Sequence, residues 1–312
     1  MALYDLVAYR HRLIQALQVG GATDKLLELQ NNISNVKNQI PVLSDENKEY
    51  LNSLVDHYTQ VIELTQKPAL EFSQHLEKVN NEISKITHQL FANNYELEEK
   101  NGDAEFTRNH RRIYINEDVE DIIKQRILLH TSWRYPALEI GCRDGQWTQF
   151  LVAADPLYIM DRHSEFLEST SSKFTPEYQR RLRVYPLINH NLSVLPKDQF
   201  AFVFSWGYFN YVSMDTMKQY LKQIFTLLRP GGSFMFSYND GDTPAGAGMA
   251  ENFSQTYMPK SMLIPLAESI GFSVDGQFDY EPNVSWLELK HPGELHTVKS
   301  HQVMGEIRLI GT

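Results

Sequence analysis

Residues 136–148 read PALEIGCRDGQWT, and this segment decides how the rest of the chain is interpreted. A short apolar run ends at Ile140, glycines follow at Gly141 and Gly145, and a helical pattern continues through residues 150–152. We therefore predict a strand that turns tightly into a helix, because glycine allows an unusual φ and the close approach of a ligand. A turn of this kind predicts a cradle for a small molecule.

The composition favours a folded chain with two domains. The sequence has 312 residues, 42% of them hydrophobic, and a net charge of −10, which does not favour nucleic acid as a partner. Cys142 is the single cysteine, so an intramolecular disulfide and a multi-cysteine zinc site are excluded, and no metal is expected. No segment has the ~20 consecutive apolar residues of a membrane span. The sequence therefore predicts a soluble, cytoplasmic protein.

The first third of the chain, residues 1–110, has the periodicity of helices. Apolar residues recur at alternating spacings of three and four in runs from Leu26 to Leu43, Leu51 to Val61 and Phe72 to Leu90. This spacing is typical of a coiled-coil seam, which must be buried against a neighbour. We predict an α-helical coiled-coil domain for homo-oligomerisation or docking. A two- or three-helix bundle that only supports the second domain remains the alternative.

Residues 111–312 alternate between strand and helix patterns and form the predicted second domain. Besides the first strand, apolar runs predict strands at 157–161, 182–188, 200–205 and 233–237. Strands that alternate with helices predict a parallel sheet, with ligands beyond the carboxyl ends of the strands. The last β-rich segments predict an antiparallel edge, and they lie at 272–280, 284–289 and 303–310.

The order of motifs in this second part resembles the class I S-adenosylmethionine-dependent methyltransferases. Residues 138–145, LEIGCRDG, look like the first motif of that family, acid-x-Gly-x-Gly-x-Gly. Asp161 stands where the family's second strand ends in an acid, and residues 227–232, LLRPGG, look like its Leu-Lys-Pro-Gly-Gly turn. Residues 195–205 and 257–272 resemble the approach to the fourth strand and the segment that ends in Gly-Phe. The resemblance implies a Rossmann-like fold.

This resemblance also implies a cofactor, S-adenosyl-L-methionine, and residues that bind it. The methionine part would lie over the turn from Gly141 to Gly145, and Asp161 would accept both ribose hydroxyls, because a carboxylate offers two acceptor oxygens. The adenine would lie near residues 189–192. The cofactor-binding residues implied by the resemblance are Glu139, Gly141, Arg143, Gly145, Asp161, Asn191 and Ser205. No catalytic residue is assigned, but the candidates on the acceptor side are Tyr208, Tyr238 and Asp240.

Arg143 replaces the middle glycine of the motif. A positive φ at this position would strain the turn, and the side chain would have to point away from the cofactor or contact its carboxylate. Two hypotheses follow. The chain is a methyltransferase that acts on a small molecule or a protein side chain, or it is an assembly protein with a degenerate, inactive methyltransferase-like domain.

Overall fold

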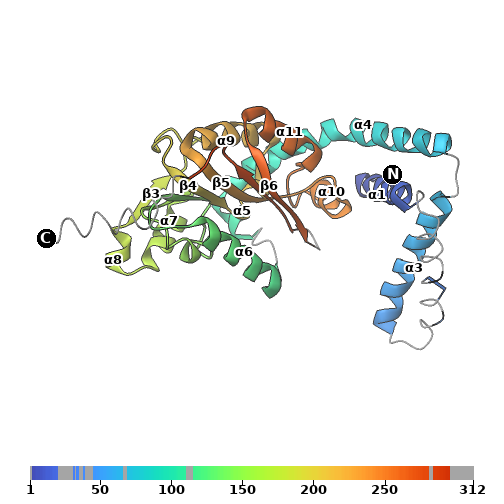
Figure 1. Cartoon of the computed structure of the whole chain (residues 1–312), viewed down its shortest axis with the longest axis horizontal. Helices are drawn as coiled ribbons and strands as arrows, with labels where there is room; N and C mark the ends of the chain where they lie inside the picture. The colour runs from blue at the N-terminus through green and yellow to red at the C-terminus, as the bar shows by residue number, and fades with distance from the viewer. Residues whose placement is uncertain are drawn as a thin grey trace. The chain divides into compact units, whose positions relative to one another are not determined.

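The computed structural model describes residues 2–19, 31, 33–34, 38, 45–65, 69–109, 115–280 and 284–295. The chain divides into two compact units (Figure 1). One unit comprises residues 1–92 and 241–253, and the other comprises residues 93–240 and 254–312. The division into autonomous domains near residue 110 stays a prediction.

The second unit is built on a sheet whose described strands have the order β3-β2-β1-β4-β5-β7-β6. The strands from β3 to β5 are parallel, and β7 pairs antiparallel with both β5 and β6. This confirms the Rossmann-like sheet with an antiparallel C-terminal edge; the predicted strand at 303–310 lies outside the described residues. The bounds are β1 Ala137–Ile140, β2 Leu157–Asp161, β3 Leu182–Pro186, β4 Phe200–Ser205, β5 Leu228–Tyr238, β6 Ser273–Tyr280 and β7 Val284–Lys290.

Helices cover both faces of this sheet. Helices α9 and α11 lie on one face and α6 and α7 on the other (Figure 1). All four residues of β1 are buried between these layers, because β1 pairs with β2 on one side and β4 on the other. The helix bounds are α5 Ala104–Asn109, α6 Glu117–His130, α7 Ser164–Ser172, α8 Pro176–Gln179, α9 Met214–Leu227 and α11 Lys260–Ile270.

The helix predicted after Gly145 is wrong. Residues Thr148–Phe150 form only one turn of 3-10 helix, η2, before the chain returns to β2. Between the glycine turn at residues 141–145 and Leu157, the chain instead runs through turns and bends at residues 151–156. The Thr148 hydroxyl also donates to the buried Glu139 side chain at 2.5 Å, which ties this turn to β1.

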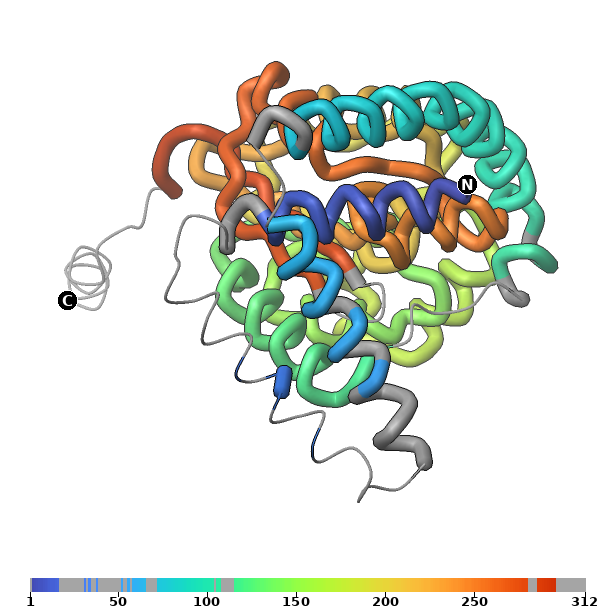
Figure 2. The backbone as a smooth tube through the Cα atoms, turned by 90° about the vertical axis from the view of Figure 1, so that its right-hand side faces the viewer, coloured from blue at the N-terminus to red at the C-terminus, as the bar shows by residue number. Residues whose placement is uncertain are grey.

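The first unit is helical. It contains α1 Leu3–Val19, α3 Asp45–Thr65, most of α4 Ala69–Asn101, and α10 Pro244–Glu251, and α1 packs against α3 and α10 (Figure 2). In α4, the seam residues Val79, Ile83 and Leu90 are buried within the single chain. The coiled coil stays a prediction, and most of the run from Leu26 to Leu43 lies outside the described residues.

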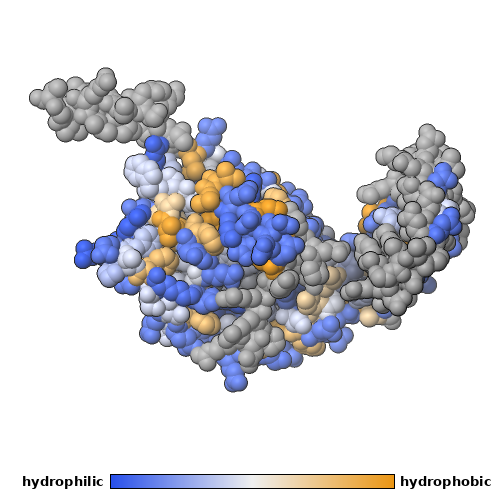
Figure 3. Space-filling view, turned by 90° about the horizontal axis from the view of Figure 1, so that it is seen from below, coloured by the Kyte–Doolittle hydropathy of each residue, from blue (hydrophilic) through white to orange (hydrophobic). Residues whose placement is uncertain are grey.

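No described helix has the length and apolar character that crossing a membrane requires. On the face shown in Figure 3, hydrophobic residues form separate patches among hydrophilic ones.

Candidate active site

The glycine turn after β1 has the geometry that the sequence predicts. Gly141 and Gly145 both have φ of +76°, and the Gly141 amide donates to the Met160 carbonyl of β2 at 2.7 Å. A Cβ atom at Gly145 would lie 2.9 Å from the Thr170 side chain of α7. Both glycines are therefore required, by backbone conformation and by the close approach of neighbours.

Asp161 ends β2 beside this turn. Its two carboxylate oxygens accept the backbone amides of Arg143 and His163, each at 3.0 Å. Burial raises the pKa of the Asp161 carboxyl, and the hydrogen bonds from His163 and Arg143 oppose that rise. An ionised carboxylate has about four acceptor positions, so two remain for further donors.

Arg143 has a φ of +47°, in the left-handed region that is unfavourable for a residue with a Cβ. The structure therefore places a strained non-glycine residue where the family has glycine. The guanidinium donates through Nη2 to the Gly207 carbonyl at 3.2 Å, and its Cζ lies over the Tyr211 ring, 5.8 Å from the centroid. The side chain thus extends from the glycine turn to the loop after β4.

Tyr208 covers the glycine turn from this same loop. A Cβ atom at Gly141 would lie 2.8 Å from Cβ and Cδ2 of Tyr208, so no residue with a side chain fits at position 141. The Tyr208 hydroxyl lies 2.8 Å from the Tyr220 hydroxyl of α9. Tyr208 is buried, which raises the pKa of its phenol.

A small pocket lies where these groups meet. It encloses about 240 Å³, with its solvent-open part included, which is less than the roughly 300–1,000 Å³ of a typical ligand site. Four of the predicted site residues line it, together with four that sequence reasoning missed. The lining residues are Gly141, Arg143, Asp161 and Tyr208, and then Asn101, Thr107, Arg162 and His163.

The four lining residues that were not predicted fall into two groups, one marked by the sequence and one not. Arg162 and His163 directly follow Asp161, so their place at a strand end was a signal in the sequence. Asn101 and Thr107 belong to the end of α4 and to α5, before the predicted domain boundary, and no motif marks them. Thr107 donates to the Asn101 carbonyl at 2.8 Å, and its hydroxyl lies 3.4 Å from His163 Nε2.

The other predicted cofactor residues are not among those that line the pocket. Glu139 is buried, and burial raises its pKa to about 8. Ser205 is buried and donates to the Ile140 carbonyl at 2.8 Å. Asn191 is exposed, and its side chain accepts the Ser193 amide at 2.8 Å.

Two of the acceptor-side candidates lie further along the same edge of the sheet. Tyr238 ends β5 and is buried. Asp240 is also buried, and its carboxylate accepts the Lys260 amide at 2.9 Å and pairs with the Lys260 ammonium at 3.3 Å. Of the three candidates, only Tyr208 lines the pocket.

Residues 137–232 match a family model described as a methyltransferase domain. Together with the parallel sheet and its antiparallel edge, this match supports a class I S-adenosylmethionine-dependent methyltransferase domain at residues 137–232. No curated protein matches the chain.

Solved structures of methyltransferases are similar in fold at low sequence identity. An S-adenosylmethionine-dependent methyltransferase from Mesorhizobium loti is 12% identical, with a TM-score of 0.47 over 55% of this chain and 97% of that one. A putative enzyme of the same kind from Listeria monocytogenes is 13% identical, with a TM-score of 0.47 over 55% of this chain and 96% of that one. A geranyl diphosphate methyltransferase in complex with SAM is 8% identical, with a TM-score of 0.47 over 56% of this chain and 86% of that one.

The Asp161 carboxylate fits the ribose of S-adenosylmethionine, the cofactor of this class of domain. The space available for the rest of that molecule is small. Asp161 keeps free acceptor positions beside the glycine turn. Above Gly141, however, the space is filled by Tyr208, and the Arg143 side chain crosses to Gly207. The pocket is therefore smaller than a typical ligand site, and Tyr208 and Arg143 take up the space beside it.

Proposed function

We propose that this protein transfers a methyl group from S-adenosylmethionine to a small molecule or a protein side chain. The observation that carries the proposal is Asp161, which ends β2 and lines the same pocket as the glycine turn. In this role the Asp161 carboxylate accepts the two ribose hydroxyls. Glycine at 141 allows the methionine part to approach the backbone.

The bound cofactor supplies a methyl group on a positively charged sulfur. The task of this chain is to hold the acceptor in line with that methyl group and to exclude water. Tyr208 is the acceptor-side candidate nearest to the turn, and Tyr238 and Asp240 are further candidates at the end of β5. A base is needed only for an acceptor that keeps a proton.

Calorimetric titration of the full chain with S-adenosylmethionine tests this function. We expect Asp161→Asn to weaken binding by about tenfold or more, because a hydrogen bond to a charged group contributes roughly 1.5–3 kcal/mol. Glu168→Gln is the matched control, since Glu168 is an exposed carboxylate on α7 outside the pocket lining. The proposal fails if the wild-type protein does not bind at millimolar cofactor, and the ribose assignment fails if Asp161→Asn binds normally.

The second candidate is an assembly protein with an inactive methyltransferase-like domain. It is favoured by Arg143, whose left-handed backbone and bond to Gly207 occupy the position of the family's middle glycine. The same titration tests this candidate, because absence of binding at millimolar cofactor would remove the enzyme and leave the assembly protein.

The N-terminal helices are proposed to serve oligomerisation or docking on another protein. The heptad spacing in α4 supports this role, although Val79 and Ile83 are buried within one chain. Light scattering of the full chain tests it: a mass that stays at 36.2 kDa counts against oligomers and leaves docking. The single cysteine supports a cytoplasmic location.

A further inference from the structure

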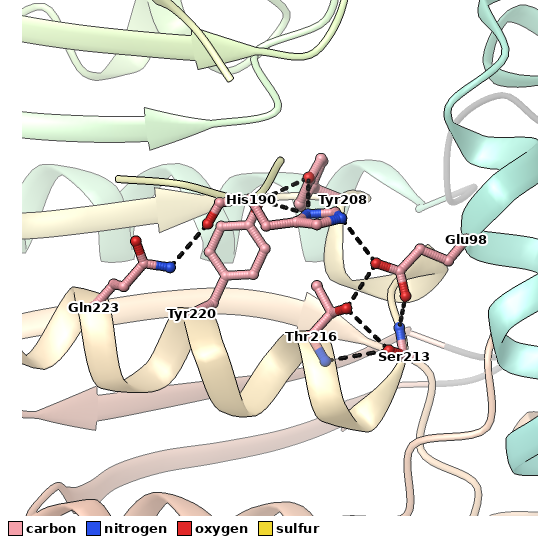
Figure 4. Close-up of polar contacts among 7 residues, drawn as sticks. All are labelled: Glu98, His190, Tyr208, Ser213, Thr216, Tyr220 and Gln223. Carbon is pink, nitrogen blue, oxygen red and sulfur yellow. Dashed lines mark hydrogen bonds and ion pairs between the residues drawn. The ribbon is translucent and has the colours of Figure 1, made fainter. Parts of the chain in front are cut away.

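Glu98, near the end of α4, is a buried carboxylate in the compact unit that contains the sheet. It belongs to the same compact unit as the sheet but lies before the matched residues 137–232. Its Oε1 accepts the Thr216 hydroxyl at 2.7 Å, and its Oε2 accepts the Ser213 amide at 3.0 Å (Figure 4). These bonds place the carboxylate at the N-terminus of α9, where a negative charge is favourable.

His190 connects Glu98 to Tyr208. The His190 Nε2 atom lies 3.0 Å from Glu98 Oε1 (Figure 4). On the other side of the ring, Nδ1 lies 3.1 Å from the Tyr220 hydroxyl and 3.5 Å from the Tyr208 hydroxyl. Gln223 fixes the His190 backbone by donating to its carbonyl at 2.8 Å. A continuous set of polar contacts thus leads from α4 to the ring that covers Gly141.

The charge of Glu98 is stabilised by the donors around it. Burial by itself would raise the pKa of Glu98, but hydrogen bonds from His190, Thr216 and Ser213 outweigh this effect and lower the pKa to about 2. Glu98 is therefore a carboxylate at neutral pH. Its removal leaves several buried donors without an acceptor, which favours rearrangement around it.

We propose that Glu98 is a positioning residue that acts through His190 to hold Tyr208 over the glycine turn, and so controls entry of the cofactor. The inference rests on the proposed function for the identity of the ligand. Its physical basis is that the Tyr208 ring fills the space above Gly141. When only the molecules with Tyr208 displaced can bind, the apparent affinity is the intrinsic affinity multiplied by the fraction of such molecules. Loss of the contacts between Glu98 and His190 raises the fraction of molecules in which Tyr208 is displaced.

The test compares Glu98→Gln with Glu99→Gln in the full chain. Glu99 is the matched control, because it is the next carboxylate on α4 and is exposed. We expect Glu98→Gln to raise amide hydrogen exchange in residues 141–145 and 207–211 by about tenfold relative to the wild type, and Glu99→Gln to leave it unchanged. The affinity for S-adenosylmethionine should rise by the same factor in Glu98→Gln.

Tyr208→Phe is the second variant. It keeps the ring but removes the hydroxyl that contacts His190 and Tyr220, so the same local rise in exchange is expected. If Glu98→Gln does not fold, Tyr208→Phe decides the question. Unchanged exchange in both segments overturns the inference, as does a rise spread evenly over the whole sheet, which is the result of a merely structural role.

The hydrogen-exchange result does not require a ligand, so it separates this inference from the proposed function. A local rise in exchange without cofactor binding supports the positioning role and removes the methyltransferase activity. Binding whose affinity is equal in the wild type and in Glu98→Gln supports the activity and overturns the positioning role.

Discussion

The backbone amide of Arg143 donates to the Asp161 carboxylate at 3.0 Å. The residue that replaces the family's middle glycine is therefore bonded to the proposed ribose acceptor. The left-handed backbone of Arg143 aims this amide at Asp161, while the side chain extends away to Gly207. One residue thus supports the carboxylate through its backbone and reduces the space of the pocket through its side chain.

These two roles of Arg143 can be separated by Arg143→Gly. Glycine keeps the amide and accepts a φ of +47° without the cost of about 1 kcal/mol that a Cβ brings in this region. Loss of the guanidinium clears the space between the glycine turn and Gly207. We expect the affinity for S-adenosylmethionine to rise by about three- to tenfold in calorimetric titration. The free energy of unfolding should change by ~1 kcal/mol or less.

The matched control is Arg180→Gly, which removes an exposed arginine far along the sequence from the turn. Its affinity for the cofactor should equal that of the wild type. Weaker binding by Arg143→Gly would contradict the prediction and would show that the guanidinium contacts the cofactor carboxylate.

Glu139 gives the stability of this protein a dependence on pH. Burial raises its pKa from 4.5 to about 8, so the folded state keeps a proton that the unfolded state releases. The contribution of Glu139 to stability is therefore full below about pH 4.5 and falls as the pH rises towards 8, by up to about 5 kcal/mol in total. Glu139→Gln removes this loss, because its amide oxygen still accepts the Thr148 hydroxyl.

The measurement is urea unfolding of the wild type and of Glu139→Gln between pH 5 and pH 8.5. The variant should be more stable than the wild type at pH 8.5, and the difference should shrink towards pH 5. Glu177→Gln, an exposed position on α8, should follow the wild type at every pH. A gap between Glu139→Gln and the wild type that does not change with pH would contradict the buried, protonated state.

The sequence predicted the sheet well because hydrophobic runs and ordered turns report directly on strands. The runs at 157–161 and 200–205 coincide with β2 and β4, and Asp161 ends its strand as expected. The turn with Gly141 and Gly145 was also visible, because glycine at fixed spacing has a specific backbone cause.

Other features depend on contacts between distant segments, which periodicity does not report. The pattern in 146–152 favours a helix, but residues Thr148–Phe150 form only one 3-10 turn, tied to β1 by the bond from Thr148 to Glu139. Tyr208, Asn101 and Thr107 reach the pocket through tertiary contacts. No local sequence motif marks these three residues. The sequence does not distinguish Glu98 from the other polar residues of its helical segment, because its partners Ser213 and Thr216 lie more than 100 positions away.

Arg126 and Glu288 form a charged pair that holds α6 against β7. Arg126 Nε donates to Glu288 Oε1 at 2.7 Å, and Nη2 contacts Oε2. The Glu288 side chain is fully buried. Its burial would raise its pKa, but hydrogen bonds from His130 and Arg126 outweigh this and lower the pKa to about 2. The pair therefore stabilises the fold above pH 4.5 and loses this contribution as the pH falls towards 2.

We expect Arg126→Ala to lower the free energy of unfolding by about 3–5 kcal/mol at pH 7, because it leaves a buried carboxylate without its main partner. The double variant Arg126→Ala/Glu288→Gln should recover part of this loss, since it removes the buried charge as well. Lys124→Ala is the control: Lys124 pairs with Glu120 and Asp121 at the surface of the same helix, and its loss should change unfolding little. Equal effects of Arg126→Ala and Lys124→Ala in urea unfolding would mean that Glu288 finds another cation or water, and that α6 is held to the sheet by its apolar residues alone.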